Sequence, residues 1–168
     1  MNRLIAIVIV AIIFAGCRKP SQYSEIPAIT FQSFTKTQTT DLLGNKIIRA
    51  QLSFYLIDGD GNIGFNDYDT VAPWSPGTEY FNNLHLTFYK VENGSTINDT
   101  TRNLAYRTPY IEPKGQNKTR KCTILIDIDY DEVFINQLIT DTIVYNFYIY
   151  DRSLNMSNVE TTGLIVLP

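Results

Sequence analysis

The sequence predicts an all-β domain, an immunoglobulin-like antiparallel β-sandwich of about seven strands with one short helical crossover. The first observation is composition, because the 168 residues include 11 Tyr and 9 Phe together with frequent Thr and Ile, which favour strands. The second is that short segments of alternating apolar and polar residues recur between turns rich in Gly, Asn and Pro. Long segments with helical periodicity are missing. Short strands at such spacings are typical of a sandwich.

The first 17 residues have the pattern of a bacterial export signal. Met1-Asn2-Arg3 is positively charged, and residues 4–14 are apolar but too few to cross a bilayer as a helix. Ala15-Gly16 then precedes Cys17, which resembles the lipobox of bacterial lipoproteins, although Phe14 replaces the usual aliphatic residue. This resemblance implies cleavage after residue 16 and acylation of Cys17. An uncleaved anchor and an ordinary secretory signal with an incidental cysteine are the alternatives.

Acylation would hold the mature chain on a membrane, because several acyl chains anchor a protein stably. Residues 17–25 are then a lipid-anchored tether and residues 26–168 the domain. Arg18-Lys19-Pro20 contains no acidic residue, which favours the periplasmic leaflet of the outer membrane over the cell surface. The net charge is −3, and no basic cluster indicates a nucleic-acid partner.

The strands follow from alternation along the domain. Residues 26–34 are the first expected strand, and residues 35–45 are a polar segment that ends in a Gly-Asn turn. The clearest strand spans residues 48–56 and is predicted to bury one face, made of Ile48, Ala50, Leu52, Phe54 and Leu56. Residues 58–78 are expected to form a long irregular connection.

The second half of the domain continues the pattern. The remaining expected strands cover residues 80–91, 100–107, 122–128, 143–149 and 159–167. Residues 92–95 read as a hairpin turn and residues 108–119 as a loop. Residues 130–140 are the expected helical crossover.

Three segments resemble a known family. They are Asp58-Gly59-Asp60-Gly61-Asn62-Ile63-Gly64, Arg107-Thr108-Pro109-Tyr110, and residues 148–158 with the sequence YIYDRSLNMSN. These segments are similar to uncharacterised Bacteroidota lipoproteins with an immunoglobulin-like domain, in which the first motif often carries Asp where this chain has Asn62. The resemblance implies the fold and supplies no activity.

The loop after residue 57 is the strongest candidate for a binding site. Oxygen-bearing side chains at alternate positions can converge on one calcium ion. An EF-hand is not expected, because Ile63 stands where that motif requires Gly and no helices flank the loop. The alternative interpretation is turn chemistry, since Asp, Asn and Gly all favour tight turns.

Topology favours the calcium interpretation. In an immunoglobulin-like sandwich, the strands that end at Asp58 and Asp151 run in the same direction, so both residues should emerge at one pole. Carboxylates crowded there would repel one another without a cation. The predicted metal ligands are Asp58, Asp60, Asn62, Asp67, Asp69, Asp151 and Asn155.

Other residues carry weaker hypotheses. Trp74 and Tyr110 are candidate ligand-binding residues, because aromatic rings next to prolines on loops can stack on sugars or partners; the alternative for Trp74 is a lid over the core. His85 is expected to face solvent, Asp127 and Asp129 to lie on an outer strand face, and Cys122 to pack as a small core residue. No catalytic residues are predicted.

The function expected from the sequence is a lipid-anchored cell-envelope protein that acts as a non-enzymatic binding or scaffolding module, with Ca2+ as its candidate stabilising ion. Its partners would be the membrane, through the N-terminal lipid, and an unidentified protein or glycan. The alternative is a carbohydrate-binding accessory lipoprotein that uses Trp74 and neighbouring tyrosines. A glycan array with Trp74→Ala would distinguish the two.

Overall fold

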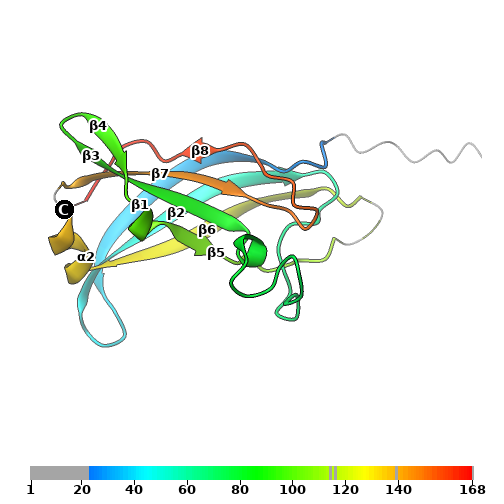
Figure 1. Cartoon of the computed structure of the whole chain (residues 1–168), viewed down its shortest axis with the longest axis horizontal. Coiled ribbons are helices and arrows are strands. Elements are labelled where there is room, and N and C mark those ends of the chain that lie inside the picture. The colour runs from blue at the N-terminus through cyan, green and yellow to red at the C-terminus, as the bar shows by residue number, and fades with distance from the viewer. Residues whose placement is uncertain (1–22, 114, 116, 139, 168) are drawn as a thin grey trace, which may run out of the picture.

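The computed structural model describes residues 23–113, 115, 117–138 and 140–167. Its strands form two antiparallel sheets packed face to face (Figure 1). One sheet has the order β1-β2-β6, formed by β1 (Ala28–Thr40), β2 (Lys46–Asp58) and β6 (Arg120–Asp131). The other has the order β4-β3-β7-β8, formed by β4 (Ser95–Asn98), β3 (Leu84–Glu92), β7 (Thr142–Ile149) and β8 (Glu160–Thr161). In that sheet β5 (Leu104–Tyr106) also pairs with β3, and β9 (Ile165–Val166) pairs with β7.

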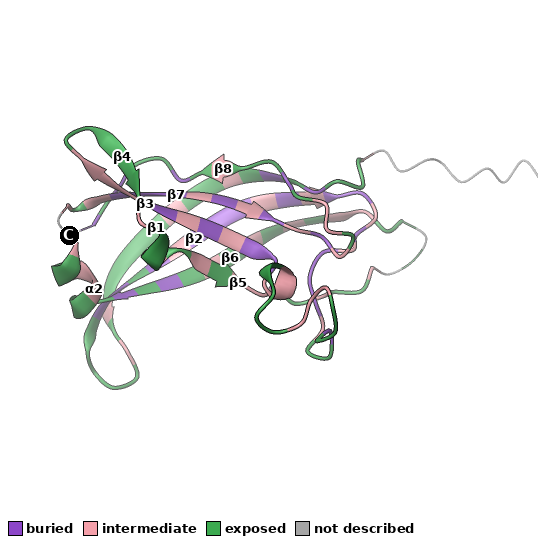
Figure 2. Ribbon diagram, viewed as in Figure 1, coloured by how far each residue is buried: buried purple, intermediate pink, exposed green. Residues whose placement is uncertain are grey.

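The core lies between the two sheets. The face of β2 predicted from alternation is buried, and Leu52, Phe54 and Leu56 are each 0% exposed. The inner face of β3 is buried in the same way. β7 contributes the facing residues Ile143, Tyr145, Phe147 and Ile149. Figure 2 shows buried segments alternating with less buried ones along these strands. The prediction of an all-β sandwich is therefore confirmed.

The order of the strands is immunoglobulin-like. β1, β2 and β6 take the places of strands A, B and E, whereas β3 and β7 take those of C and F, with β8 and β9 in the place of G. The predicted crossover is present as α2 (Glu132–Gln137), and the Asp131 side chain caps it by accepting a hydrogen bond from the Phe134 N–H. Among the described residues, no helix has both the length and the apolar character needed to cross a membrane.

Several boundaries differ from the prediction. β1 continues to Thr40 because polar residues 35–40 pair in register with β2, up to Thr40 opposite Lys46. The strand expected over residues 80–91 begins only at Leu84, after the 3-10 turn η1 (Glu79–Phe81). The strand expected over residues 100–107 is divided into the 3-10 turn η2 (Thr100–Arg102) and β5. The expected last strand is split into β8 and β9.

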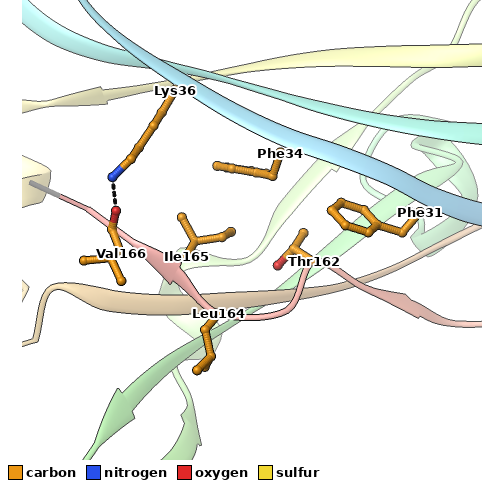
Figure 3. A pocket seen from close by; sticks show the side chains of 7 residues that line it. All are labelled: Phe31, Phe34, Lys36, Thr162, Leu164, Ile165 and Val166. Atoms are coloured by element: carbon orange, nitrogen blue, oxygen red, sulfur yellow. Dashed lines mark hydrogen bonds between the residues drawn. The ribbon is translucent and has the colours of Figure 1, made fainter.

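A small hollow of about 220 Å³ opens between β1 and the C-terminal strands. The residues that line it include Phe31, Phe34 and Ile165 (Figure 3). Lys36 crosses one side and donates a hydrogen bond to the Val166 carbonyl oxygen. None of the predicted metal ligands lines this hollow.

Residues 1–22 lie outside the described part of the chain. The predicted signal peptide, the lipidation of Cys17 and most of the predicted tether therefore remain predictions.

Candidate cation site at the loop pole

The site begins where β2 leaves the core. Asp58 is the last residue of the strand and is 0% exposed. The chain then passes very close to neighbouring backbone. A Cβ on Gly59 would lie only 2.3 Å from the Ser24 carbonyl oxygen. A Cβ on Gly61, whose φ is +69°, would lie 1.9 Å from the Lys118 carbonyl oxygen. Only glycine fits these two positions, and they return Asp60 towards Asp58.

The loop after β7 brings the third carboxylate. Asp151 forms a β-bridge with Ile63, and the Arg152 N–H donates to the Asn62 carbonyl oxygen at 3.2 Å. Asp58, Asp60 and Asp151 each place a carboxylate oxygen within 4.8 Å of the other two. The topological prediction that Asp58 and Asp151 meet at one pole is therefore confirmed.

Asp58 is the unusual member of this group. Both of its carboxylate oxygens are buried and have no hydrogen-bond partner. Burial, followed by the negative charges of Asp60 and Asp151, raises the pKa of Asp58 to about 7. The Asn62 Oδ1 atom is also buried without a partner. The Asp58 carboxylate thus faces two further carboxylates without a protein hydrogen bond to compensate its own charge.

The other two carboxylates are held in position by amides. The Asn62 side-chain amide donates to Asp60 Oδ2 at 2.8 Å and to Ser153 Oγ at 3.0 Å. Asn155 donates from its backbone N–H and its side-chain amide to the two oxygens of Asp151, both at 2.8 Å. Asn155 was predicted to be a metal ligand, but it instead holds the Asp151 carboxylate in place through these two hydrogen bonds.

The remaining predicted ligands lie elsewhere. Asp67 is exposed and is outside the group of three carboxylates. Asp69 binds the Arg152 guanidinium, with oxygen-to-nitrogen distances of 2.5 Å and 3.2 Å. The pKa of Asp69 is lowered, first by these hydrogen bonds from Arg152. The structure thus brings together Asp58, Asp60, Asn62 and Asp151, supported by Asn155.

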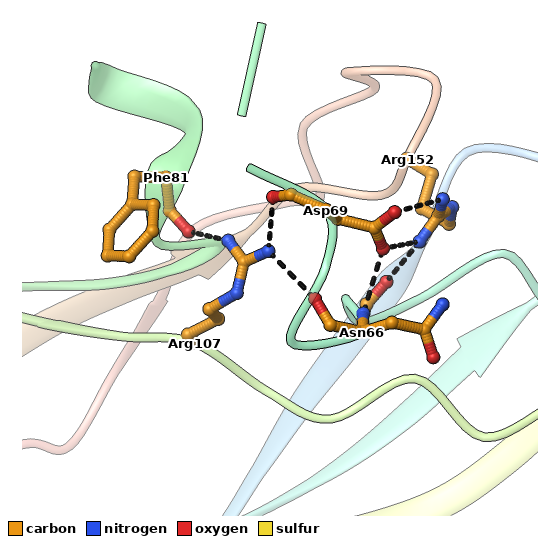
Figure 4. A network of polar contacts seen from close by, with 6 residues as sticks. Asn66, Asp69, Phe81, Arg107 and Arg152 are labelled. Atoms are coloured by element: carbon orange, nitrogen blue, oxygen red, sulfur yellow. Dashed lines mark hydrogen bonds and ion pairs between the residues drawn. The ribbon is translucent and has the colours of Figure 1, made fainter. Parts of the chain in front are cut away.

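Two arginines fasten the long loop over this pole, as Figure 4 shows. Arg107 donates to the carbonyl oxygens of Phe81, of Asn66 at 3.2 Å and of Asp69 at 2.7 Å. Its guanidinium carbon also lies 4.6 Å from the centre of the Phe65 ring. Arg152 provides the second anchor through Asp69. The sequence offered one signal for these residues, because both arginines fall in the segments on which the expected family resemblance is based.

Trp74 and Tyr110 pack around Arg152. The Arg152 guanidinium carbon lies 5.1 Å from the Trp74 ring and 5.2 Å from the Tyr110 ring. Trp74 also packs on Phe65, with 5.7 Å between the ring centres, and its indole nitrogen is buried without a partner. Trp74 therefore packs against the buried Phe65, which favours the interpretation of Trp74 as a lid over the core.

The weaker candidates lie outside the group of three carboxylates. His85 is half-buried and stacks on Tyr148, with ring centres 5.3 Å apart. Asp129 pairs with Arg49 at 2.7 Å on the outer face of the β2–β6 pair, as expected for a strand surface. Cys122 is a free cysteine that packs against the edge of the core.

Convergent carboxylate and amide oxygens are the ligands that hard divalent cations prefer.

Comparisons with protein-family models, with curated proteins and with solved structures found no match for this chain.

Proposed function

We propose that this chain is a lipid-anchored, non-enzymatic binding module of the bacterial cell envelope, and that one bound Ca2+ stabilises the loop-bearing pole of its sandwich. The proposal joins the Cys17 acylation inferred from the sequence to the acidic group at the end of β2. Loops gathered at one end of a sandwich are a common binding surface. Here those loops meet at the candidate cation site.

The burial of Asp58 is the observation that carries the proposal. A buried carboxylate without a hydrogen bond is costly, because neither water nor protein compensates its charge. Two further carboxylates beside it increase the cost by repulsion. A divalent cation would reverse both effects, since it would supply the missing partner of Asp58 and neutralise the repulsion.

The donor set favours calcium. Asp58, Asp60, Asp151 and the Asn62 amide offer oxygen atoms, and His or Cys ligands are missing from the group that the described residues form. Ca2+ accepts six to eight oxygens in variable geometry, so bidentate carboxylates and water could complete its shell. Zinc sites, by contrast, usually contain nitrogen or sulfur ligands.

Cation binding would matter for recognition because it would join two loops. Asp58 ends β2 and Asp60 belongs to the β2–β3 connection, whereas Asp151 belongs to the loop after β7. The same two loops carry Trp74 and Arg152. A bound cation would therefore reduce the mobility of the surface that a partner meets, and would lower the entropy cost of binding.

Thermal unfolding of the purified chain, with EDTA and then with millimolar CaCl2, tests the proposal. A ligand present at a hundred times its dissociation constant stabilises by about 2.7 kcal/mol. For a domain of this size, that corresponds to an increase in Tm of roughly 5–10 °C. No increase in Tm, together with no calcium heat in calorimetry, would reject the cation site.

The control variant is Asp67→Asn, which removes a nearby exposed carboxylate from the same loop. It should keep the full calcium shift, whereas Asp151→Asn should lose most of it. Equal loss in both variants would indicate a nonspecific charge effect rather than a defined site.

A further inference from the structure

The β1-β2-β6 sheet has two edges, and they are protected to different degrees. β1 has a register shift between Phe31 and Ser33, and side chains of the C-terminal segment bond to it, with Asn158 Oδ1 accepting from the Ile29 N–H at 2.8 Å. β6 pairs without interruption along β2, from Asp131 opposite Ile47 to Arg120 opposite Asp58. Within the described chain, no strand pairs with the other edge of β6.

That open edge has a topological cause. In constant-type immunoglobulin domains, strand D pairs with strand E and covers this position. Here β5, the strand that precedes β6, pairs with β3 in the opposite sheet, with Leu84 opposite Tyr106. The outer edge of β6 therefore has no paired strand among the described residues. Long uncovered edges are templates for pairing with a further chain.

The side chains of β6 indicate which strand fits. Its outer face carries Lys121 near one end, Asp127 and Asp129 near the other, and Leu125 in the middle with 56% exposure. Its inner face carries Ile124 and Ile126, which are only partly buried although they pack against the core. A neighbouring strand with the opposite order of charges along its length and an apolar residue at its centre would complement both faces of β6.

We infer that a second copy of this chain occupies the edge, through antiparallel β6–β6 pairing about a two-fold axis at Leu125. Residues that face each other in an antiparallel pair point to the same side of the sheet, so outer residues must meet outer residues. With Leu125 opposite its own copy, Lys121 faces Asp129 of the other molecule. In the same register, Ile124 faces Ile126 on the inner side.

Neighbouring registers fit less well. A shift that places Ile126 on the axis sets Leu125 against Asp127, and a shift that places Ile124 on the axis sets Leu125 against Thr123. Lys121 and Asp129 keep their present partners in the proposed register: Lys121 contacts Tyr23, and Asp129, whose side chain is 44% exposed, pairs with Arg49. The dimer would join the two three-stranded sheets into one continuous sheet.

Disulfide cross-linking of the full chain in membranes tests the inference. Leu125→Cys is made with Cys122→Ser, so that the new cysteine is the only one on β6. Facing Cα atoms in an antiparallel pair lie about 4.5–5.5 Å apart, which is within the range of about 4.4–6.8 Å for disulfides. The variant should form a covalent dimer of twice the chain mass.

The matched control is Thr37→Cys with Cys122→Ser, an exposed position on the β1 edge. Equal cross-linking of the two variants, no cross-linking at Leu125→Cys, or an adduct of any other mass would overturn the inference. Acylation of Cys17 would remove its thiol from disulfide exchange, and any disulfide through an unacylated Cys17 would appear equally in both variants.

Charge exchange tests the register. Lys121→Asp places like charges opposite each other twice in the dimer, which should weaken dimerisation about tenfold. Adding Asp129→Lys reverses the pair and should restore cross-linking of Leu125→Cys. Failure of the reversed pair to restore it, while the chain remains folded by circular dichroism, would refute pairing in this register.

Discussion

Asp58 shows how strand alternation can bury a charged residue at a candidate site. The alternation of β2 puts its side chain on the inner face, where the core of the sandwich excludes water. At the last position of the strand, the loop residues Asp60 and Asp151 replace hydrophobic neighbours. Without a cation, Asp58 is therefore a destabilising group that the rest of the core must offset.

Asp58→Asn should stabilise the cation-free chain at pH 8 and abolish its response to calcium. The pKa of Asp58 is raised from 3.8 to about 7, so its contribution to stability is present below pH 3.8 and is lost as the pH rises to about 7. The asparagine variant lacks this loss. We expect it to be more stable than the wild type by roughly 2 kcal/mol at pH 8 in EDTA.

The measurement is denaturant unfolding of both chains in EDTA at pH 4, 6 and 8. The difference between them should grow as the pH increases and then level off above pH 7. A difference that is constant with pH, or a wild type that is the more stable chain at pH 8, would contradict a raised pKa at Asp58.

Among the structural elements, the β2–β3 connection needs the most explanation. It is long and largely irregular, and loops of this kind are usually either functional or mobile. Its order comes from Arg107 and Arg152, which bond to backbone and carboxylate oxygens within it and lie against Phe65 and Trp74. A planar guanidinium can do both, because it forms several hydrogen bonds at its edge and stacks on rings with its face.

Arg152→Lys should therefore loosen the loop although the charge is kept. An ammonium cannot bind both oxygens of Asp69 in the planar bidentate manner and stack on Trp74 at the same time. Limited proteolysis should cut the variant between residues 66 and 77 several-fold faster than the wild type. The fluorescence of Trp74, the only tryptophan in the chain, should shift to longer wavelength as its ring meets water.

Arg49→Lys provides the control, because Arg49 makes a similar bidentate pair with Asp129 on an exposed strand surface. It should change neither proteolysis nor fluorescence. If Arg152→Lys also left proteolysis and fluorescence unchanged, that result would contradict the role of the Arg152 guanidinium in holding the loop.

For the whole molecule, the proposal depends on where the N-terminus is held. Residues 23–26 lie against the acidic turn, since the Gly59 N–H donates to the Ser24 carbonyl oxygen at 2.8 Å. Cys17 precedes Tyr23 by six residues, which span at most about 21 Å when extended. An acylated Cys17 would therefore hold the loop-bearing pole, with its candidate cation site, close to the membrane.

Cys17→Ser should release the protein from the membrane fraction. Growth with an alkyne-labelled fatty acid should label the wild type and leave this variant unlabelled, because the thiol that accepts the first lipid is lost. Cys122→Ser is the control and should be labelled as the wild type is. Labelling that persists in Cys17→Ser would contradict the lipobox interpretation.

Protection of the wild type from protease added to intact cells would favour the periplasmic leaflet.

The sequence alone determined the sandwich, because the alternation in β2, β3 and β7 records which side of each strand faces the core. With the two strands assigned to positions B and F, the sequence also predicted that Asp58 and Asp151 share a pole, because those strands run in the same direction. Its errors occurred where partners override local composition. Polar residues 35–40 are strand because β2 pairs with them, and the expected last strand is divided because short stretches of it meet different parts of β7.

Only the tertiary structure decided which acidic residues belong together. Asp58, Asp60, Asp67 and Asp69 look alike in the sequence, yet Asp67 faces solvent and Asp69 meets an arginine far away along the chain. The difference lies in burial and in long-range partners, which the spacing of residues does not record. The open edge of β6 has the same origin, since local sequence does not state that β5 pairs with β3 rather than with β6.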